Sequence, residues 1–178
     1  MKPKVLSKTI SYKGFWFLVE RKKIKLQNEK IVEWESIRAN DGVAIVAVDN
    51  DNNVYFSKEW RPAFEKEILQ IPAGECPGKT YKDQLKQARN ELREEIGFDA
   101  KKWEKLITMI IGGRMKSRVH IFLARDLFPS KKKRSDTEII EVVKMPFKKA
   151  YDLFFKNGVL TTAYTLVGLF LAKEKLKI

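Results

Sequence analysis

One segment with the period of a helix, set between segments with the period of strands, limits the possible folds of this chain most. Its apolar residues recur at helical spacing: Leu85, Ala88, Leu92 and Ile96. Thr80 and Asp83 loosely match a capping box at the start, and Gly97 stands where a left-handed carboxyl-terminal cap would stand. The pattern predicts a helix over residues 80–96.

Segments typical of strands lie on both sides of this helix. From Lys8 to Glu35 the chain alternates apolar and polar residues, with a turn signal near Asn28, which predicts antiparallel strands. Residues 42–48 and 54–56 predict a hairpin, because the Asn and Asp residues between them supply turn chemistry. Further expected strands are 67–71, 103–111, 118–124 and 139–145, and further expected helices are 148–156 and 161–175. This order of elements predicts a mixed sheet between helices.

The chain is strongly basic, with 36 Lys and Arg against 23 Asp and Glu and a formal charge of +13. A positive field attracts nucleic acid, anionic lipid and small polyphosphates alike, so charge alone does not choose among them. The basic residues are spread out, with short runs at 21–23 and 131–134, and spread charge is most often a solvated surface. We therefore expect a background field and no nucleic-acid partner.

Cysteine content and apolar runs bear on the compartment. Cys76 is the only cysteine, so the chain forms no internal disulfide, which fits a reducing cytoplasm. The apolar run at 163–172 is about half of the ~20 residues that cross a bilayer, so it is interpreted as a buried helix. The first residues lack the apolar core of a secretion signal. We expect a cytoplasmic protein with no membrane partner.

The predicted helix carries three carboxylates, Glu91, Glu94 and Glu95. At about 100° per residue, Glu91 and Glu95 lie within ~40° of each other, with Glu94 about one step further round, so the carboxylates should converge. Like charges at this spacing repel, and more so as water is excluded. A hard divalent cation, Mg²⁺ or Mn²⁺, would compensate them because it prefers oxygen ligands. The alternative is a solvated acidic face that pairs with basic residues of the same helix.

This segment resembles the signature of the Nudix hydrolases, G-x5-E-x7-R-E-U-x-E-E-x-G-U, where U is an aliphatic or bulky apolar residue. The second half matches in register at Glu91, Leu92, Glu94, Glu95, Gly97 and Phe98. The first half departs, since the family's Gly, Glu and Arg positions hold Cys76, Lys82 and Asn90. Gly74 would supply the glycine if the loop carried a two-residue insertion.

Other segments resemble one branch of this family, the ADP-ribose pyrophosphatases and nucleoside diphosphate sugar hydrolases. The similar segments are 12–16, 59–62, 69–74 and 112–124, in the same order as in that branch. The resemblance implies an α/β fold, a Nudix α/β/α sandwich with a mixed sheet, over residues 41–178. It also implies an amino-terminal antiparallel sheet over residues 1–40 that mediates a domain-swapped homodimer.

The resemblance further implies a metal site on the carboxylate helix. Glu91 and Glu95 would bind divalent cations together with the carbonyl of Ala73, and Glu94 would be a weaker ligand. Mg²⁺ or Mn²⁺ in such a site would clamp a diphosphate, neutralise charge that develops on phosphorus, and lower the pKa of a bound water.

The family usually takes its general base from an acidic loop late in the chain. Here that position holds Glu138, which we favour as the base, and Asp136, which is the second candidate. The alternative is a surface acid beside the basic run at 131–134. Geometry must decide, because a general base has to reach the proton that it accepts.

Three residues are implied in substrate binding. Arg61 resembles the branch's arginine that contacts the diphosphate, and a guanidinium fork suits that role. Its alternative is an ion pair with Glu59 or Glu65. Phe15 or Trp16 would stack on the nucleobase, as aromatic residues of this branch do, often from the partner subunit. The alternative for both is ordinary packing in a core.

The implied activity is divalent-metal-dependent hydrolysis of the diphosphate bond of ADP-ribose or a nucleoside diphosphate sugar, giving a nucleoside monophosphate and a sugar phosphate. One alternative is a Nudix hydrolase of NADH, dinucleoside polyphosphates or capped RNA. The other is a catalytically silent Nudix domain that binds nucleotide or RNA. The basic charge and the degenerate first half of the signature favour the silent domain, whereas the three helix carboxylates favour an enzyme.

Overall fold

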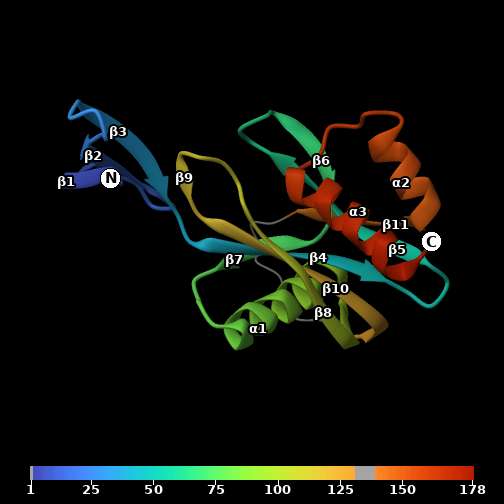
Figure 1. Ribbon diagram of the computed structural model, residues 1–178. Coiled ribbons are helices and arrows are strands. Elements are labelled where there is room, and N and C mark those ends of the chain that lie inside the picture. Colours follow the sequence, from blue (N-terminus) through green and yellow to red (C-terminus); the bar gives the residue numbers. More distant parts are fainter. Residues whose placement is uncertain (1, 131–138) are drawn as a thin grey trace.

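The computed structural model describes residues 2–130 and 139–178, and this part of the chain forms two sheets with helices on both faces of the larger one (Figure 1). The strands are β1 (Lys4–Lys13), β2 (Leu18–Lys25), β3 (Ile31–Arg38), β4 (Asp41–Val48), β5 (Asn53–Arg61), β6 (Lys66–Gln70), β7 (Ala73–Cys76), β8 (Phe98–Ile110), β9 (Met115–Lys116), β10 (Arg118–Pro129) and β11 (Ile140–Pro146). The helices are α1 (Tyr81–Glu91), the π turn η1 (Leu92–Ile96), α2 (Phe147–Phe155) and α3 (Ala163–Leu176).

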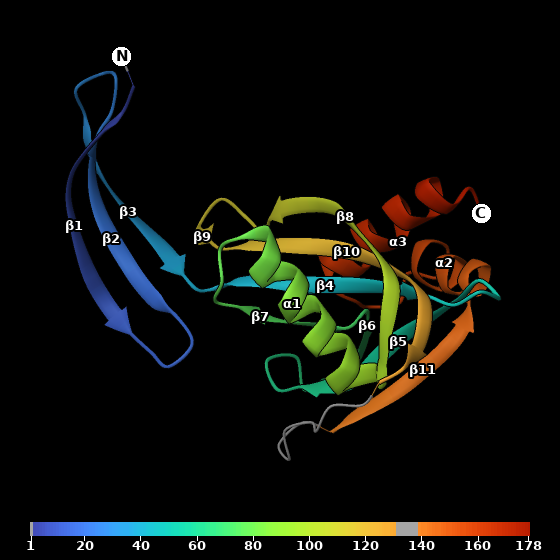
Figure 2. The same ribbon diagram turned by 90° about the horizontal axis from the view of Figure 1, so that it is seen from below.

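The larger sheet has the strand order β11-β5-β4-β10-β8, with β6 paired to β5 and β7 paired to β4. The pair β4 and β10 is parallel and the other pairs of this sheet are antiparallel, so the sheet is mixed. Helix α1 covers one face, and α2 and α3 cover the other (Figures 1 and 2). The predicted α/β/α sandwich is confirmed.

Strand β4 supplies side chains to the cores on both faces of the sheet. Val43, Ile45 and Ala47 pack under α1, while Ala44, Val46 and Val48 pack under α2 and α3. These six residues are buried, as expected for a central strand covered by a helix layer on each side. None of the helices in the described ranges combines the length and apolar character that a membrane crossing needs.

The amino-terminal sheet is formed by β1, β2 and β3 as antiparallel neighbours, with the short β9 added in parallel to β3. It lies at one end of the molecule, away from the three helices (Figures 1 and 2). Every residue of β1 is exposed. The chain passes from β3 to β4 through Ala39 and Asn40, where the predicted division at 40/41 falls. That these are separate domains stays a prediction.

The structure departs from the predicted elements in several places, among them β9, which was not predicted, and β5, which extends to Arg61 beyond the predicted 54–56. Strand β7 was not predicted, because the prolines and glycines around Ala73–Cys76 hide a segment that is extended through its pairing with β4. The regular helix ends at Glu91, and the last predicted turn is a π turn. Strands β8 and β10 extend to Phe98 and Pro129, since each continues the other's ladder beyond the apolar run.

Candidate active site

The carboxylate helix begins and ends with the caps that its sequence predicts. The Asp83 amide donates to the Thr80 hydroxyl at 3.2 Å, and the Asp83 carboxylate accepts the Thr80 amide at 3.1 Å. At the other end the Gly97 amide donates to the Leu92 carbonyl at 3.1 Å, an i to i+5 bond that defines the π turn. Gly97 has φ 83°, a left-handed value that glycine adopts without strain. Single π turns of this kind recur at functional sites.

Glu95 lies inside this turn with 5% of its surface exposed. One of its oxygens accepts the Ala73 amide at 3.2 Å. Burial, together with the negative charges of Glu91 and Glu59, raises the pKa of Glu95 to about 8, while the Ser57 hydroxyl and the Ala73 amide oppose the rise. The solvated acidic face considered as an alternative therefore does not describe Glu95.

Glu91 packs directly on the backbone of β7. A side chain on Gly74 would overlap the Glu91 carboxylate, so only glycine allows this approach. Gln87, one turn earlier, donates its amide to Glu91 at 2.6 Å. The glycine that touches the first carboxylate of the helix is therefore Gly74, two residues before Cys76.

Two arginines near the end of the same helix, Arg89 and Arg93, face β8. Arg93 donates to Asp99 at 3.0 Å through Nε, and Arg89 lies 3.7 Å from the same carboxylate and 5.8 Å from the centre of the Trp103 ring. Asp99 is buried with these two guanidinium groups beside it. The arginines thus fasten the end of the helix to the first residues of β8.

The donor set suits a hard divalent cation. A buried carboxylate that neighbouring carboxylates destabilise gains from a cation beside it. Among residues 2–130 and 139–178, no three His, Cys, Asp or Glu side chains form a ready metal cluster, and the predicted ligand set of Glu91, Glu95 and the Ala73 carbonyl, with Glu94 as a weaker ligand, stays a prediction. Such a cation would take its remaining ligands from backbone carbonyls, water and substrate oxygens, as Mg²⁺ commonly does.

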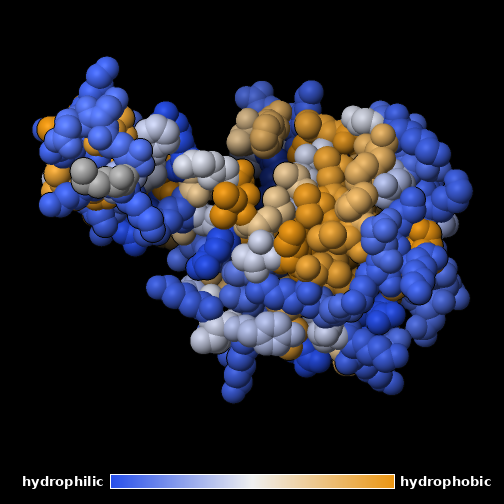
Figure 3. Space-filling model, in the orientation of Figure 1, coloured by the Kyte–Doolittle hydropathy of each residue, from blue (hydrophilic) through white to orange (hydrophobic). Residues whose placement is uncertain are grey.

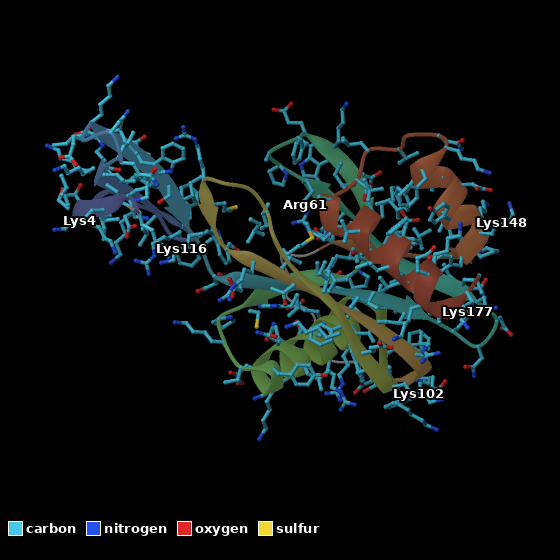
Figure 4. The ribbon with its side chains drawn as sticks, in the orientation of Figure 1. Lys4, Arg61, Lys102, Lys116, Lys148 and Lys177 are labelled. Carbon is cyan, nitrogen blue, oxygen red and sulfur yellow. The ribbon has the colours of Figure 1, made fainter. Side chains whose placement is uncertain are left out.

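Strand β5 brings a second set of polar groups to Glu95. Ser57, Glu59 and Arg61 occupy alternate positions and so share one face of the strand. The Arg61 guanidinium forms an ion pair with Glu59, which is the ion pair considered in the sequence as the alternative to a substrate contact. The Arg61 side chain nevertheless stays 40% exposed and lies near the start of α3 (Figure 4).

A cavity of about 350 Å³ opens beside Arg61. Its walls are mostly apolar and include Phe64, Ile68, Met109, Ile111 and Leu160, and polar groups are contributed by Thr161, Thr162 and Tyr164. Apolar side chains also gather over the region of α3 on the face shown in Figure 3. A mostly apolar pocket with a few polar groups and one cation is the usual form of a small-molecule site.

The two aromatic residues predicted to stack on a base do not line the cavity beside Arg61. Phe15 and Trp16 lie in the connection between β1 and β2, 90% and 67% exposed, with their rings edge to face at 4.9 Å. They belong to the amino-terminal sheet, so within one chain they are separate from the carboxylate helix (Figure 2). The two predicted general bases, Glu138 and Asp136, lie outside the described residues.

The structure adds three residues that the sequence prediction missed. Ser57 faces Glu95, and Gln70 and Tyr164 join Glu59 through hydrogen bonds. Ser57 and Gln70 are polar residues at fully buried positions of strands β5 and β6. A polar residue inside an apolar strand run is the one signal in the sequence that could have marked them.

His120 is packed, as predicted, with 2% of its surface exposed. Its Nδ1 lies 2.9 Å from the Thr108 hydroxyl and its Nε2 lies 3.6 Å from the Asp41 carboxylate. Burial, followed by the charge of Lys105, lowers the pKa of His120. The ring is therefore a neutral part of the sheet.

Among residues 2–130 and 139–178, the basic side chains are spread over the molecule. The lysines labelled in Figure 4 lie on widely separated edges of the molecule, from Lys4 on the amino-terminal sheet to Lys148 on α2. Many of the cations pair with carboxylates, as Lys144 does with Asp49 at 2.7 Å. This distribution agrees with the expected background field.

No protein-family model matches the chain. The chain is 30% identical over 148 residues to an ADP-ribose pyrophosphatase of Bacillus subtilis (strain 168), which covers 80% of this chain and 79% of the relative. It is 25% identical over 179 residues to the ADP compounds hydrolase NudE of Escherichia coli (strain K12), covering 99% of this chain and 94% of that protein. A crystal structure of an ADP compounds hydrolase matches the fold with a TM-score of 0.85 and 25% identity, over 99% of this chain and 95% of that one.

Proposed function

Because the chain belongs to the Nudix hydrolases and is a pyrophosphohydrolase of their ADP-ribose pyrophosphatase branch, we propose that it hydrolyses the diphosphate bond of ADP-ribose or a related nucleoside diphosphate sugar. The products are a nucleoside monophosphate and a sugar phosphate. The observation that carries the proposal is the buried Glu95, set among Glu91, Glu59 and the Ala73 amide, with Arg61 ion-paired to that same Glu59. The name of the Bacillus subtilis relative supports the substrate class.

The metal dependence of the reaction is part of the proposal. Glu91, Glu95 and the Ala73 carbonyl would hold Mg²⁺ or Mn²⁺, with Glu94 as a weaker ligand. A cation bound there neutralises charge that develops on phosphorus and lowers the pKa of a coordinated water. Arg61 binds the diphosphate oxygens through its guanidinium fork, and Glu59 orients that fork from behind.

A general base must accept a proton from the attacking water. We assign this role to Glu138, with Asp136 as the second candidate, since both follow the basic run late in the chain. Their carboxylates lie outside the described residues, so replacement of each by its amide is the test. Loss of turnover with unchanged KM in one variant identifies the base.

The amino-terminal sheet, residues 1–40, is proposed to pair with a second copy of the chain, while residues 41–178 form the hydrolase domain. The exposed apolar side chains of β1 and the neighbouring Phe15 and Trp16 support this assignment. From the partner, Phe15 or Trp16 would stack on the nucleobase, because within one chain they lie on a separate sheet.

A second candidate function follows from the relative named ADP compounds hydrolase, which matches nearly the whole chain. The name of that relative is broader than ADP-ribose, and it favours ADP-containing substrates such as NADH or diadenosine polyphosphates. The chemistry at phosphorus is the same, and only the group beyond the diphosphate differs.

One panel tests both candidates. The purified protein is incubated with ADP-ribose, GDP-mannose, UDP-glucose, NADH and diadenosine polyphosphates, each with Mg²⁺, with Mn²⁺ and with EDTA. We expect AMP and ribose 5-phosphate from ADP-ribose with a metal and no product with EDTA. Cleavage of NADH or diadenosine polyphosphates with the highest kcat/KM would favour the second candidate. If no compound is cleaved and RNA binds with a steep salt dependence, the chain is a silent binding domain.

A further inference from the structure

A series of partly buried hydrogen bonds runs from α3 to Arg61. The Tyr164 hydroxyl on α3 donates to the Gln70 side-chain oxygen at 3.0 Å. The Gln70 amide nitrogen, at the end of β6, donates to Glu59 Oε1 at 3.1 Å. The same Glu59 oxygen forms the ion pair with Arg61. The Gln70 amide of β6 and the Arg61 guanidinium of β5 therefore meet on one Glu59 oxygen, and α3 is connected to that oxygen through Gln70.

The direction of these bonds is fixed by the chemistry of the groups. A carboxylate only accepts, so the amide nitrogen of Gln70 must face Glu59 and its oxygen must face Tyr164. The phenol then has to donate. Burial raises the pKa of Tyr164, which keeps its proton in place. Because each end of the Gln70 amide has one hydrogen-bond partner among the described residues, these hydrogen bonds have one arrangement.

Gln70 is an unusual residue for its position. Its side chain is fully buried, although an apolar side chain of similar volume would fill the same space. A buried amide is costly unless its polar atoms are bonded, and here both ends are bonded. In the β5–β6 ladder Gln70 lies opposite Ser57, and Glu59 stands two residues further along β5 on the same face. The amide is thus placed to hold Glu59 on the side of the candidate site.

We propose that Gln70 and Tyr164 are positioning residues that fix the Glu59 carboxylate, so that Arg61 is already oriented when the diphosphate binds. The inference rests on the proposed function of Arg61. An exposed arginine loses side-chain freedom when it binds an anion, and prior orientation lowers that cost. Loss of these hydrogen bonds is therefore expected to weaken substrate binding and to leave the chemical step unchanged.

Two substitutions that nearly keep the size of the side chain test this series of hydrogen bonds. Q70M removes both of its bonds and Y164F removes the outer one. We expect KM for the preferred nucleoside diphosphate to rise about tenfold in Q70M and about threefold in Y164F, with kcat within about twofold of wild type. In an R61A background the same substitutions should leave KM unchanged, because the residue that they orient is gone. Unchanged KM in both single variants, or equal increases with and without Arg61, would overturn the inference.

A substitution that adds a charge gives a sharper test. Q70E places two carboxylates against each other and should raise KM at least tenfold. The exchange E59Q/Q70E should not recover KM, because the amide at position 59 would turn its NH₂ group toward the carboxylate at position 70, and Arg61, which binds the same atom in the wild type, would then face a donor. Recovery of wild-type KM in E59Q/Q70E would contradict the role of Glu59 as the acceptor that holds Arg61.

Thr165→Val is the matched control. The Thr165 hydroxyl accepts the Ile71 amide at 3.1 Å at the same boundary between α3 and the end of β6, and it lies 2.8 Å from the Thr162 hydroxyl, but it is not one of the hydrogen-bonded groups from Tyr164 through Gln70 and Glu59 to Arg61. We expect T165V to lower the melting temperature with KM within about twofold of wild type. A KM increase in T165V equal to that of Q70M would show a general effect of loosened packing. Turnover by the wild type tests the proposed function, whereas the ratio of variant to wild-type KM, on whichever panel compound is cleaved, tests the positioning role.

Discussion

The two sheets of this molecule use similar strand patterns and bury them differently. In the seven-stranded sheet, helices cover both faces, and Val43 to Val48 of β4 are buried. In the amino-terminal sheet no residue of β1 is buried, although Val5, Leu6 and Ile10 are apolar. A period of two predicts a strand, but only a covering layer turns the strand's apolar face into a core. The amino-terminal sheet has such an apolar face, and no covering layer lies on β1 in the described part of one chain.

The same contrast separates the proposed roles. The carboxylates, Arg61 and the cavity belong to the seven-stranded part, whereas Phe15 and Trp16 belong to the other sheet. Catalytic side chains have to be held rigidly in a site that excludes water, which the seven-stranded sheet and its helices provide. Exposed aromatic side chains are sufficient to contact a partner or a nucleobase. The predictions below change matched residues in the two sheets.

The largest effect is expected from Glu95→Gln. Loss of this carboxylate should lower kcat about 1,000-fold, or about 4 kcal/mol in activation free energy, while an amide of equal size keeps the fold. Turnover with Mg²⁺ measures the fall in kcat, and a thermal melt shows whether the fold is kept. The control is Glu35→Gln on the amino-terminal sheet, where Glu35 forms an exposed ion pair with Arg21 at 2.9 Å, and turnover should stay at the wild-type level. Undiminished turnover in E95Q would remove Glu95 from the metal site.

A comparison of Phe56→Ala with Ile10→Ala tests the difference in burial. Phe56 is fully buried, with its ring 5.5 Å from that of Phe154, so its loss should cost about 3–5 kcal/mol in the free energy of unfolding. Ile10 is 59% exposed, and its loss should cost the subunit about 0.5 kcal/mol or less. Urea unfolding measures both, and sedimentation shows whether I10A weakens self-association. An equal cost for both would mean that the amino-terminal sheet has a core of its own.

Gly74→Ala separates the site from the fold. The added methyl group would overlap the Glu91 carboxylate, a flexible side-chain end, so the fold should survive while the carboxylate moves. We expect kcat/KM to fall about 10- to 100-fold, or about 1.4–2.7 kcal/mol. The control is Gly42→Ala on the neighbouring strand β4, where a methyl group would meet other atoms no closer than 3.4 Å. If G74A were as active as G42A, the approach of β7 to the helix would not matter for catalysis.

The smallest effect concerns the hairpin tips of the two sheets. Asp49 accepts the Asn53 amide at 2.8 Å and pairs with Lys144, so Asp49→Ala should cost about 1–2 kcal/mol. Asn28→Ala, at the exposed tip of the amino-terminal sheet, should cost about 0.5 kcal/mol or less. Burial by itself would raise the pKa of Asp49, but Lys144 and Asn53 outweigh it and hold the pKa below its usual value.

This pKa shift sets the sign of a pH dependence. A carboxylate with a lowered pKa in the folded state contributes its stabilisation at neutral pH and loses it as the pH falls through that pKa. The difference in unfolding free energy between wild type and D49A should therefore shrink below about pH 4. A difference that stays constant down to pH 3 would mean that the charge of Asp49 contributes nothing.

Local patterns allowed most of the fold to be predicted, because the helix at 80–96 and the hairpin around residues 49–53 are set by neighbours in the sequence. Strand β7 was missed because its extended form depends on β4, about 30 residues earlier, and not on its own period. The proximity of Glu91 to Glu95 could be predicted from their helical spacing.

The rest of the candidate site depends on how α3 packs over β6. Tyr164 and Gln70 are 94 residues apart in the sequence, and no local pattern connects them. Ser57 faces Glu95 only because β5 runs past the end of the carboxylate helix. The resemblance to a family supplied the role of Arg61, whereas the residues behind Arg61 became visible only in the structure.

The π turn at Leu92–Ile96 also determines where this chain can change its length. Removal of one residue there would rotate Glu91 by about 100° relative to whatever follows on the helix and would carry it away from Glu95. An added or removed residue at the exposed tip near Asn28 would alter only the shape of a hairpin loop. Insertions and deletions should therefore be tolerated at the tips of the sheets. They should not be tolerated within the five residues Leu92–Ile96, because the number of residues there sets the position of Glu95 relative to Glu91.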